Sequence, residues 1–106
     1  MDSFIALADP TRRKIVEHLA SAPQMAAGDI AARFTLSKPA ISQHLNALKA
    51  ANLVTVEVRG QQRIYRLNRD GLDEMDAWIA RTRRHWTQAL DTLETLLMTE
   101  NPDEPD

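Results

Sequence analysis

The chain has 106 residues, about the size of one domain, and its 43% hydrophobic and 26% charged residues are the balance of a globular protein. It contains no cysteine, which excludes disulfides, thiolate metal sites and cysteine nucleophiles. The net charge is -2, yet residues 33 to 69 hold seven lysines and arginines against the single acid Glu57, so this segment suits a polyanionic partner.

Three helices are predicted in the first third of the chain. Residues 3 to 8 form a short apolar helix. Asp9 followed by Pro10 indicates the start of a second helix, because aspartate is a favoured N-cap and proline is tolerated at the first helical position. This helix stops around residues 21 to 23, and a third, short helix covers residues 27 to 34.

A fourth helix is predicted over residues 37 to 51, where the hydroxyl of Ser37 can cap its start. Ile41, Leu45 and Leu48 have the spacing of one apolar stripe, and this stripe must face the core. An advance of about 100° per residue then leaves small, polar and basic side chains on the outer face and its flank. These side chains are Lys38, Pro39, Ser42, Gln43, Asn46, Lys49 and Ala50.

Residues 53 to 67 have the pattern of a β-hairpin, with a glycine-bearing turn in the sequence RGQQR at residues 59 to 63. Arg59 and Arg63 stand on either side of that turn. The tip of the hairpin is therefore expected to be basic.

A long helix is predicted from about Asp70 to about Met98, which is more than a domain of this size needs for its own core. Its apolar positions recur every seven residues in two series, a pattern typical of a helix that packs along a partner helix. The series are Leu72, Ile79, Trp86 and Leu93, and Met75, Thr82, Ala89 and Leu96. We expect one domain over residues 1 to 98 and an acidic, disordered tail over residues 99 to 106.

The order α-α-α-α-β-β-α is that of a mostly α winged helix-turn-helix with a small β-hairpin, and the sequence resembles the ArsR family of bacterial repressors. The stretches that carry the resemblance are ALADPTRRKIVEHL at residues 6 to 19, LSKPAISQHLNALKAANLV at 36 to 54 and RGQQRIYRL at 59 to 67. The resemblance implies a homodimer joined by the first and last helices that binds operator DNA and regulates transcription, as a repressor and in some relatives of its own operon. It places the 37 to 51 helix in the major groove and the 59 to 63 wing on the backbone or minor groove.

Carried over onto this sequence, the family pattern assigns DNA contacts to the start of the fourth helix and to the wing. The residue types agree, because glutamine pairs with adenine in the major groove and arginine or lysine reaches phosphate or guanine. With the outer face described above, the expected DNA-binding residues are Ser37, Lys38, Pro39, Ser42, Gln43, His44, Asn46, Lys49, Arg59, Gln61, Gln62, Arg63 and Tyr65. His44 has a second interpretation as a buried hydrogen-bonding group, because it lies nearer the apolar stripe than Gln43 does.

The dimer contacts implied by the resemblance fall on the first helix and on the apolar side of the last helix. They are Phe4, Leu7, Met75, Ile79, Trp86, Leu90, Leu93 and Leu97. Trp78 and Trp86 are interpreted as packing residues, with an aromatic ligand pocket as the alternative. The cluster from Arg81 to His85 either touches DNA or an anion, or pairs with acids of an antiparallel partner, and we prefer the charge pairing.

We expect no metal and no cofactor. The thiolate sensor of the family needs cysteines on the third helix, where this chain has MAAGDIAARF. The acid and histidine sensor would find only His85 on the last helix, beside three arginines that disfavour a cation. Whether a small-molecule effector exists stays open. Asn52 stands where the family usually has glycine, and asparagine tolerates the left-handed backbone that this position often requires.

No combination of nucleophile and base, no paired carboxylates and no glycine-rich phosphate loop points to an enzyme. The remaining alternative is a winged-helix module that binds another protein and has lost DNA binding, which the arginines of the wing argue against. The N-terminus lacks a secretion signal and no stretch approaches the ~18 apolar residues of a membrane span, so we expect a cytoplasmic protein with no membrane partner.

Overall fold

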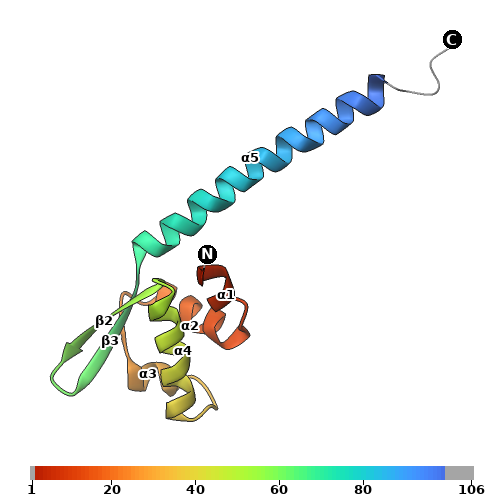
Figure 1. The fold of residues 1–106 in the computed structure, drawn as a ribbon. Coiled ribbons are helices and arrows are strands. Elements are labelled where there is room, and N and C mark those ends of the chain that lie inside the picture. The colour runs from red at the N-terminus through yellow and green to blue at the C-terminus, as the bar shows by residue number, and fades with distance from the viewer. Residues whose placement is uncertain (1, 100–106) are drawn as a thin grey trace. The chain divides into compact units, whose positions relative to one another are not determined.

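The computed structural model describes residues 2–99. Its elements in chain order are α1 (Asp2–Ala6), α2 (Pro10–Ser21), β1 (Met25–Ala26), α3 (Ala27–Ala31), α4 (Lys38–Ala50), β2 (Val54–Arg59), β3 (Gln62–Leu67) and α5 (Arg69–Thr99) (Figure 1). They form two compact units, one up to Met75 and one from Asp76 onward. The predicted disordered tail starts at residue 99, but Thr99 is the last residue of α5. Residues 100 to 106, the rest of that predicted tail, lie outside the described residues.

The predicted fold class is confirmed, with two corrections. The hairpin is part of a three-stranded antiparallel sheet in the order β1-β3-β2, because Met25 pairs with Tyr65 and Ala26 with Ile64. A strand of two residues is too short to show an alternating pattern in the sequence. Helix α3 is also shorter than expected, since the chain leaves it through a tight turn in which the Phe34 N–H donates to the Ala31 carbonyl.

Both predicted helix caps are present. The Asp9 carboxylate accepts a hydrogen bond from the backbone N–H of Arg12 at 3.0 Å, and Pro10 opens α2. The Ser37 hydroxyl accepts one from the backbone N–H of Ala40 at 3.3 Å. Each cap satisfies a backbone donor that has no partner inside its helix.

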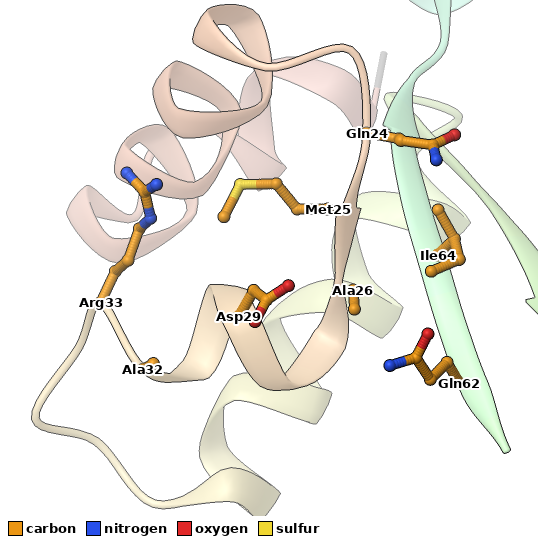
Figure 2. Close-up of a pocket in the computed structure, with 8 residues that line it drawn as sticks. All are labelled: Gln24, Met25, Ala26, Asp29, Ala32, Arg33, Gln62 and Ile64. Carbon is orange, nitrogen blue, oxygen red and sulfur yellow. The ribbon is translucent and has the colours of Figure 1, made fainter.

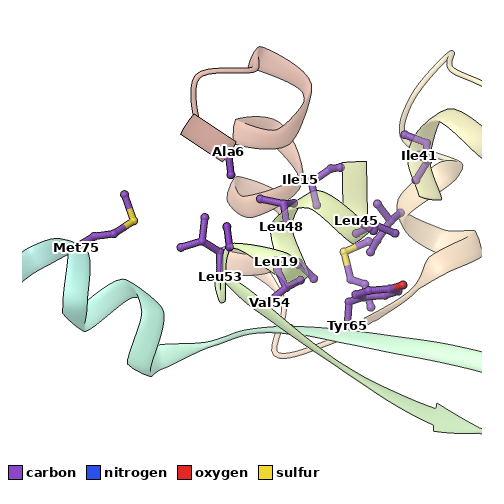
Figure 3. Close-up of a cluster of buried hydrophobic side chains, with 13 residues drawn as sticks. Ala6, Ile15, Leu19, Ile41, Leu45, Leu48, Leu53, Val54, Tyr65 and Met75 are labelled. Carbon is purple, nitrogen blue, oxygen red and sulfur yellow. The ribbon is translucent and has the colours of Figure 1, made fainter. Parts of the chain in front are cut away.

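The core of the first unit lies where α2, α3 and α4 meet the sheet (Figure 3). Ile41, Leu45 and Leu48 of α4 are buried there as expected, at no more than 2% exposure. Burial of one such side chain contributes roughly 1.5 to 3 kcal/mol. This stripe therefore fixes which face of α4 remains in solvent.

Helix α4 ends in a Schellman motif centred on Asn52. The φ angle of Asn52 is 65°, which confirms the left-handed backbone expected at this position. The N–H of Leu53 donates to the carbonyl of Leu48, and the N–H of Asn52 to that of Lys49, both at 3.0 Å. The side-chain amide of Asn68 also donates to the Asn52 carbonyl. This turn directs the chain from α4 into the hairpin.

Gly71, in the first turn of α5, packs directly against that turn. A Cβ atom at position 71 would lie 1.9 Å from the carbonyl oxygen of Asn52 and 2.8 Å from its carbonyl carbon. Real Cβ atoms do not approach a backbone so closely. Only glycine therefore allows α5 to start in this place, and nothing in the local sequence pattern indicates this.

Substitution of Gly71 by alanine is expected to lower the free energy of unfolding by about 1 to 3 kcal/mol or more, because the backbone at Asn52 must shift. Gly28 is the matched control, since a Cβ there meets nothing within 4 Å. Gly28→Ala should leave stability unchanged or raise it by up to about 1 kcal/mol. Urea unfolding of both variants measures the difference, and equal stabilities would contradict the close packing.

Candidate nucleic-acid interface

The outer face of α4 is in solvent throughout its length. Every residue assigned to this face is exposed, in contrast to the buried stripe opposite it. The exposed residues are Lys38, Pro39, Ser42, Gln43, Asn46, Lys49 and Ala50, together with the N-cap residue Ser37. Acidic side chains are absent from α4. The face can therefore offer amide, hydroxyl and ammonium groups to an anionic surface.

His44 is engaged inside the protein, as the second interpretation of the sequence proposed. Its side chain is 20% exposed, and its Nδ1 atom lies 3.4 Å from Nη1 of Arg12 and 3.7 Å from Oδ2 of Asp9. The hydrogen bond from the Arg12 backbone is the main cause of a lowered pKa of Asp9, and the charges of His44 and Arg12 lower it further. His44 thus contacts the start of α2 through its Nδ1 edge.

The wing consists of β2 and β3, joined by the two-residue turn Gly60-Gln61. Gly60 has a φ angle of 60°, which the first central position of a type II′ hairpin turn requires. Arg59 pairs with Gln62 and Val58 with Arg63 across the hairpin. The expected wing residues Arg59, Gln61, Gln62 and Arg63 are all exposed around this tip.

Glu57 forms ion pairs with Arg59 and Arg66, two of the three arginines in the wing. Arg59 Nε donates to Glu57 Oε2 at 2.6 Å, and Nη2 of Arg66 lies 3.4 Å from Glu57 Oε1. The hydrogen bond and charge of Arg59 lower the pKa of Glu57, and Glu57 in turn raises the pKa of Arg59. Arg63 forms no ion pair within the described residues, so its guanidinium is available to an outside anion.

The structure contradicts the prediction that Tyr65 contacts DNA. Its side chain is 3% exposed and forms part of the core. The reason is the register of the sheet, in which Tyr65 lies between Met25 and Val56 on the central strand. A ring enclosed in this way is inaccessible to a nucleic acid.

A groove of about 520 Å³ lies between the α3 segment and β3 (Figure 2). It is lined by Gln24, Met25, Ala26, Asp29, Ala32, Arg33, Gln62 and Ile64. A second hollow of about 340 Å³ shares Asp29 and Gln62 and extends to Arg63. The groove contains one acid, Asp29, and one base, Arg33, so its charges do not favour an anionic ligand. Over residues 2–99, no group of three or more metal-ligating side chains occurs.

The second unit is an amphipathic helix with an apolar stripe along one side. An advance of about 100° per residue brings its exposed large apolar residues, apart from Met98, into an arc of about 120°. We call these residues the α5 stripe: Trp78, Ile79, Trp86, Leu90, Leu93, Leu96 and Leu97. In the single chain they are between 42% and 67% exposed. Within the described residues, no helix is long and apolar enough to cross a membrane.

The residues expected at a dimer interface divide into two groups. Ile79, Trp86, Leu90, Leu93 and Leu97 are exposed on the α5 stripe, whereas Phe4 and Leu7 are half-buried against the core. Met75 was expected at the dimer interface, but it is 8% exposed and packs in the core of its own chain. The α5 arginines 81, 83 and 84 form no ion pair in the part of the chain that the structure describes.

Three residues that organise the wing were not expected from the sequence: Glu57 and Arg66 within it, and Gln24 just before β1. Arg66 donates to Gln24 Oε1 through Nε at 3.0 Å and through Nη2 at 2.7 Å. A two-residue turn fixes the hairpin register and places Glu57 diagonally across from Arg66 on one face, so this pair was within reach of sequence reasoning. Arg12 was also missed, and no sequence signal connects it to His44.

Comparison with known proteins agrees with this geometry. A family model described as a helix-turn-helix domain matches residues 7–57. The HTH-type transcriptional regulator Rv2034 of Mycobacterium tuberculosis is 43% identical over 92% of this chain and 88% of its own length. The transcriptional repressor SdpR of Bacillus subtilis is 46% identical over 72% of this chain and 83% of its own length.

Solved structures show the same architecture. An ArsR-like transcriptional regulator from Rhodococcus sp. RHA1 superposes with a TM-score of 0.79 at 32% identity, over 90% of this chain and 89% of that one. The homodimeric winged helix-turn-helix DNA-binding domain of Mb0332 from Mycobacterium bovis gives a TM-score of 0.63 at 25% identity, over 78% of this chain and 76% of that one.

The contact between Glu57 and Arg59 makes a measurable prediction. In Arg59→Gln the pKa of Glu57 should rise toward its ordinary value of 4.5, because the carboxylate loses its main hydrogen bond and nearest charge. Since folding lowers this pKa, the pair stabilises the fold above the unfolded pKa, and the effect is lost as the pH falls through the folded pKa. A carboxyl NMR titration measures the shift, with Arg63→Gln as a control that should leave Glu57 unaffected. An unchanged Glu57 titration in Arg59→Gln would rule out the pair.

Proposed function

The chain belongs to the ArsR family of winged helix-turn-helix transcriptional regulators, and we propose that it is a repressor that binds a palindromic operator as a homodimer. It is a DNA-binding regulator by family. The observation that carries the finer proposal is the exposed, acid-free outer face of α4 beside a basic hairpin. Repression is inferred from the similarity to a transcriptional repressor.

In this proposal α4 enters the major groove and reads bases. An α-helix fits that groove, and the amide of Gln43 can pair with N6 and N7 of adenine. Asn46 is exposed on the same face, with Ser42 and Lys49 on its flank. Lys38 at the start of the helix is positioned to meet phosphate.

The wing neutralises the DNA backbone. Arg63 is the strongest candidate for a phosphate contact, because Arg59 and Arg66 already share the carboxylate of Glu57. The Glu57 carboxylate restricts the side chains of Arg59 and Arg66 and offsets part of their positive charge. The salt dependence of binding should therefore respond to Arg63 more than to Arg66.

The proposed partner of the α5 stripe is a second copy of the chain. Seven large apolar side chains on one helix face are more than a monomer leaves in water, and a homodimeric relative shares the fold. Arg83 lies on the same flank of α5 as Asp76 and Glu94, so an antiparallel copy could pair these charges. A two-fold dimer in turn implies a palindromic site with half-sites about one helical turn apart.

Leu93→Lys is expected to weaken dimerisation by at least about tenfold, because a two-fold dimer brings two ammonium groups into the α5 stripe. Gln88→Lys adds the same charge on the opposite face of α5 and should leave the dimer intact. Sedimentation equilibrium at micromolar concentration measures both. A monomeric wild type would argue against the homodimer, and an unaffected Leu93→Lys would place the interface elsewhere.

The roles of helix and wing are separated by two variants. The cognate probe is the duplex that the wild type selects from a random DNA library. Gln43→Ala should cost ~1 to 3 kcal/mol for each base that Gln43 reads in this duplex, and little on unselected DNA. Arg63→Ala should weaken binding to both and reduce the salt slope by about one unit for each phosphate that is no longer neutralised, whereas Arg66→Ala should change the slope less.

Titration of all three variants at several salt concentrations is the measurement. If Gln43→Ala weakens both DNAs equally while Arg63→Ala affects only the selected duplex, the assigned roles are reversed. A wild type that selects no sequence contradicts operator binding and favours the alternative of a protein-interaction module.

A further inference from the structure

Helix α1 is joined to α4 by two side chains. The hydroxyl of Ser3, a residue 4% exposed, donates to the carbonyl of Ala51 at the end of α4. The second link is Arg12, whose Nε donates to the carbonyl of Ala6 in α1 at 2.6 Å and whose Nη1 lies 3.4 Å from Nδ1 of His44 in α4. One guanidinium thus bridges the last residue of α1 and the middle of the DNA-facing helix.

The geometry of this contact fixes the role of His44. The Nδ1 atom of His44 lies 3.4 Å from Nη1 of Arg12 and 3.7 Å from Oδ2 of Asp9, so this edge of the ring faces the start of α2. The Nδ1 edge of the ring therefore serves an internal contact and is not free to meet a base. Its neighbour Gln43, by contrast, is exposed on the outer face.

Arg12 is itself well anchored. Its backbone N–H caps onto Asp9, and its side chain is held at the Ala6 carbonyl, so the position of the guanidinium follows the junction between α1 and α2. A movement of α1 relative to α2 would carry Arg12 Nη1 away from His44. Together with the hydrogen bond from Ser3 to Ala51, this bridge links the position of α1 to α4, in addition to the packing of the buried stripe of α4.

We infer that Arg12 is a positioning residue that transmits the placement of α1 to α4 through His44, so that operator affinity depends on a residue that does not touch DNA. The inference rests on the proposed operator binding by α4. On this inference, a change that moves α1 relative to α2 changes operator affinity without altering any group that touches DNA.

Arg13 provides a matched control. It is the next residue of α2 and donates to the carbonyls of the two residues that follow α1, Leu7 at 2.9 Å and Ala8 at 3.3 Å, but no hydrogen bond or ion pair within residues 2–99 links it to α4. Arg12→Leu and Arg13→Leu therefore remove the same charge and a similar hydrogen bond to the α1 end. Only Arg12→Leu breaks the bridge.

The test is the affinity for the selected duplex and for unselected DNA, with folding followed by circular dichroism. Arg12→Leu and His44→Leu should each weaken the selected complex roughly tenfold, and the double variant should be no weaker than either alone. His44→Asn should bind within about twofold of the wild type, because its amide oxygen can accept from Arg12. Arg13→Leu should also stay within about twofold.

Several outcomes of these binding measurements would contradict the proposed role of Arg12. Additive losses in the double variant, or a loss in His44→Asn equal to that in His44→Leu, would mean that His44 contacts DNA itself and would overturn the inference. So would equal effects of Arg12→Leu and Arg13→Leu. If Arg12→Leu does not fold, the comparison of His44→Leu with His44→Asn decides. A wild type that selects no duplex removes the proposed function and this inference together.

Discussion

Burial of Ile41, Leu45 and Leu48 along one side of α4 is the constraint on which the rest of the molecule depends. These side chains occupy the centre of the core, where α2, α3 and the sheet converge. Because a helix is rigid, burying one face determines the opposite face with no further choice. The residues that face solvent on α4, which we propose to contact DNA, therefore follow from the packing of its opposite face.

The wing shows how a single acid can shape a basic surface. Glu57 is the one carboxylate among seven cations in residues 33 to 69, and it lies between Arg59 and Arg66. The two ion pairs are half exposed, so they contribute little to stability. Their main effect is to restrict two long side chains and to leave Arg63 as the wing arginine without an ion pair inside the described residues.

The two units of the chain are stabilised in different ways. The first unit buries its own core, whereas the helix from Asp76 to Thr99 exposes most of its apolar surface when the chain is considered alone. Isolated helices are marginally stable in water, and an exposed stripe of leucines and tryptophans adds a further cost. Partner binding on this helix would therefore stabilise the helix itself as well as join two chains.

The order of the five helices and the two hairpin strands, the two helix caps, the left-handed Asn52 and the buried stripe of α4 could all be predicted from the sequence, because each depends on residues close together in the chain. The outer face of α4 followed directly. Residues at the border between the buried stripe and the outer face of α4 were harder to assign from the sequence. His44 lies at the border of the stripe, and periodicity alone could not decide between solvent and interior.

Only the tertiary structure decided features that depend on distant residues. The two-residue strand β1 exists because β3 is there to pair with it, and this pairing buries Tyr65. Met75 belongs to the core because α5 starts against the turn at Asn52, which requires a glycine at position 71. Arg12 and His44 are 32 positions apart, and no local pattern indicates that they meet. Local propensities specify the elements, whereas contacts between elements depend on how the whole core packs.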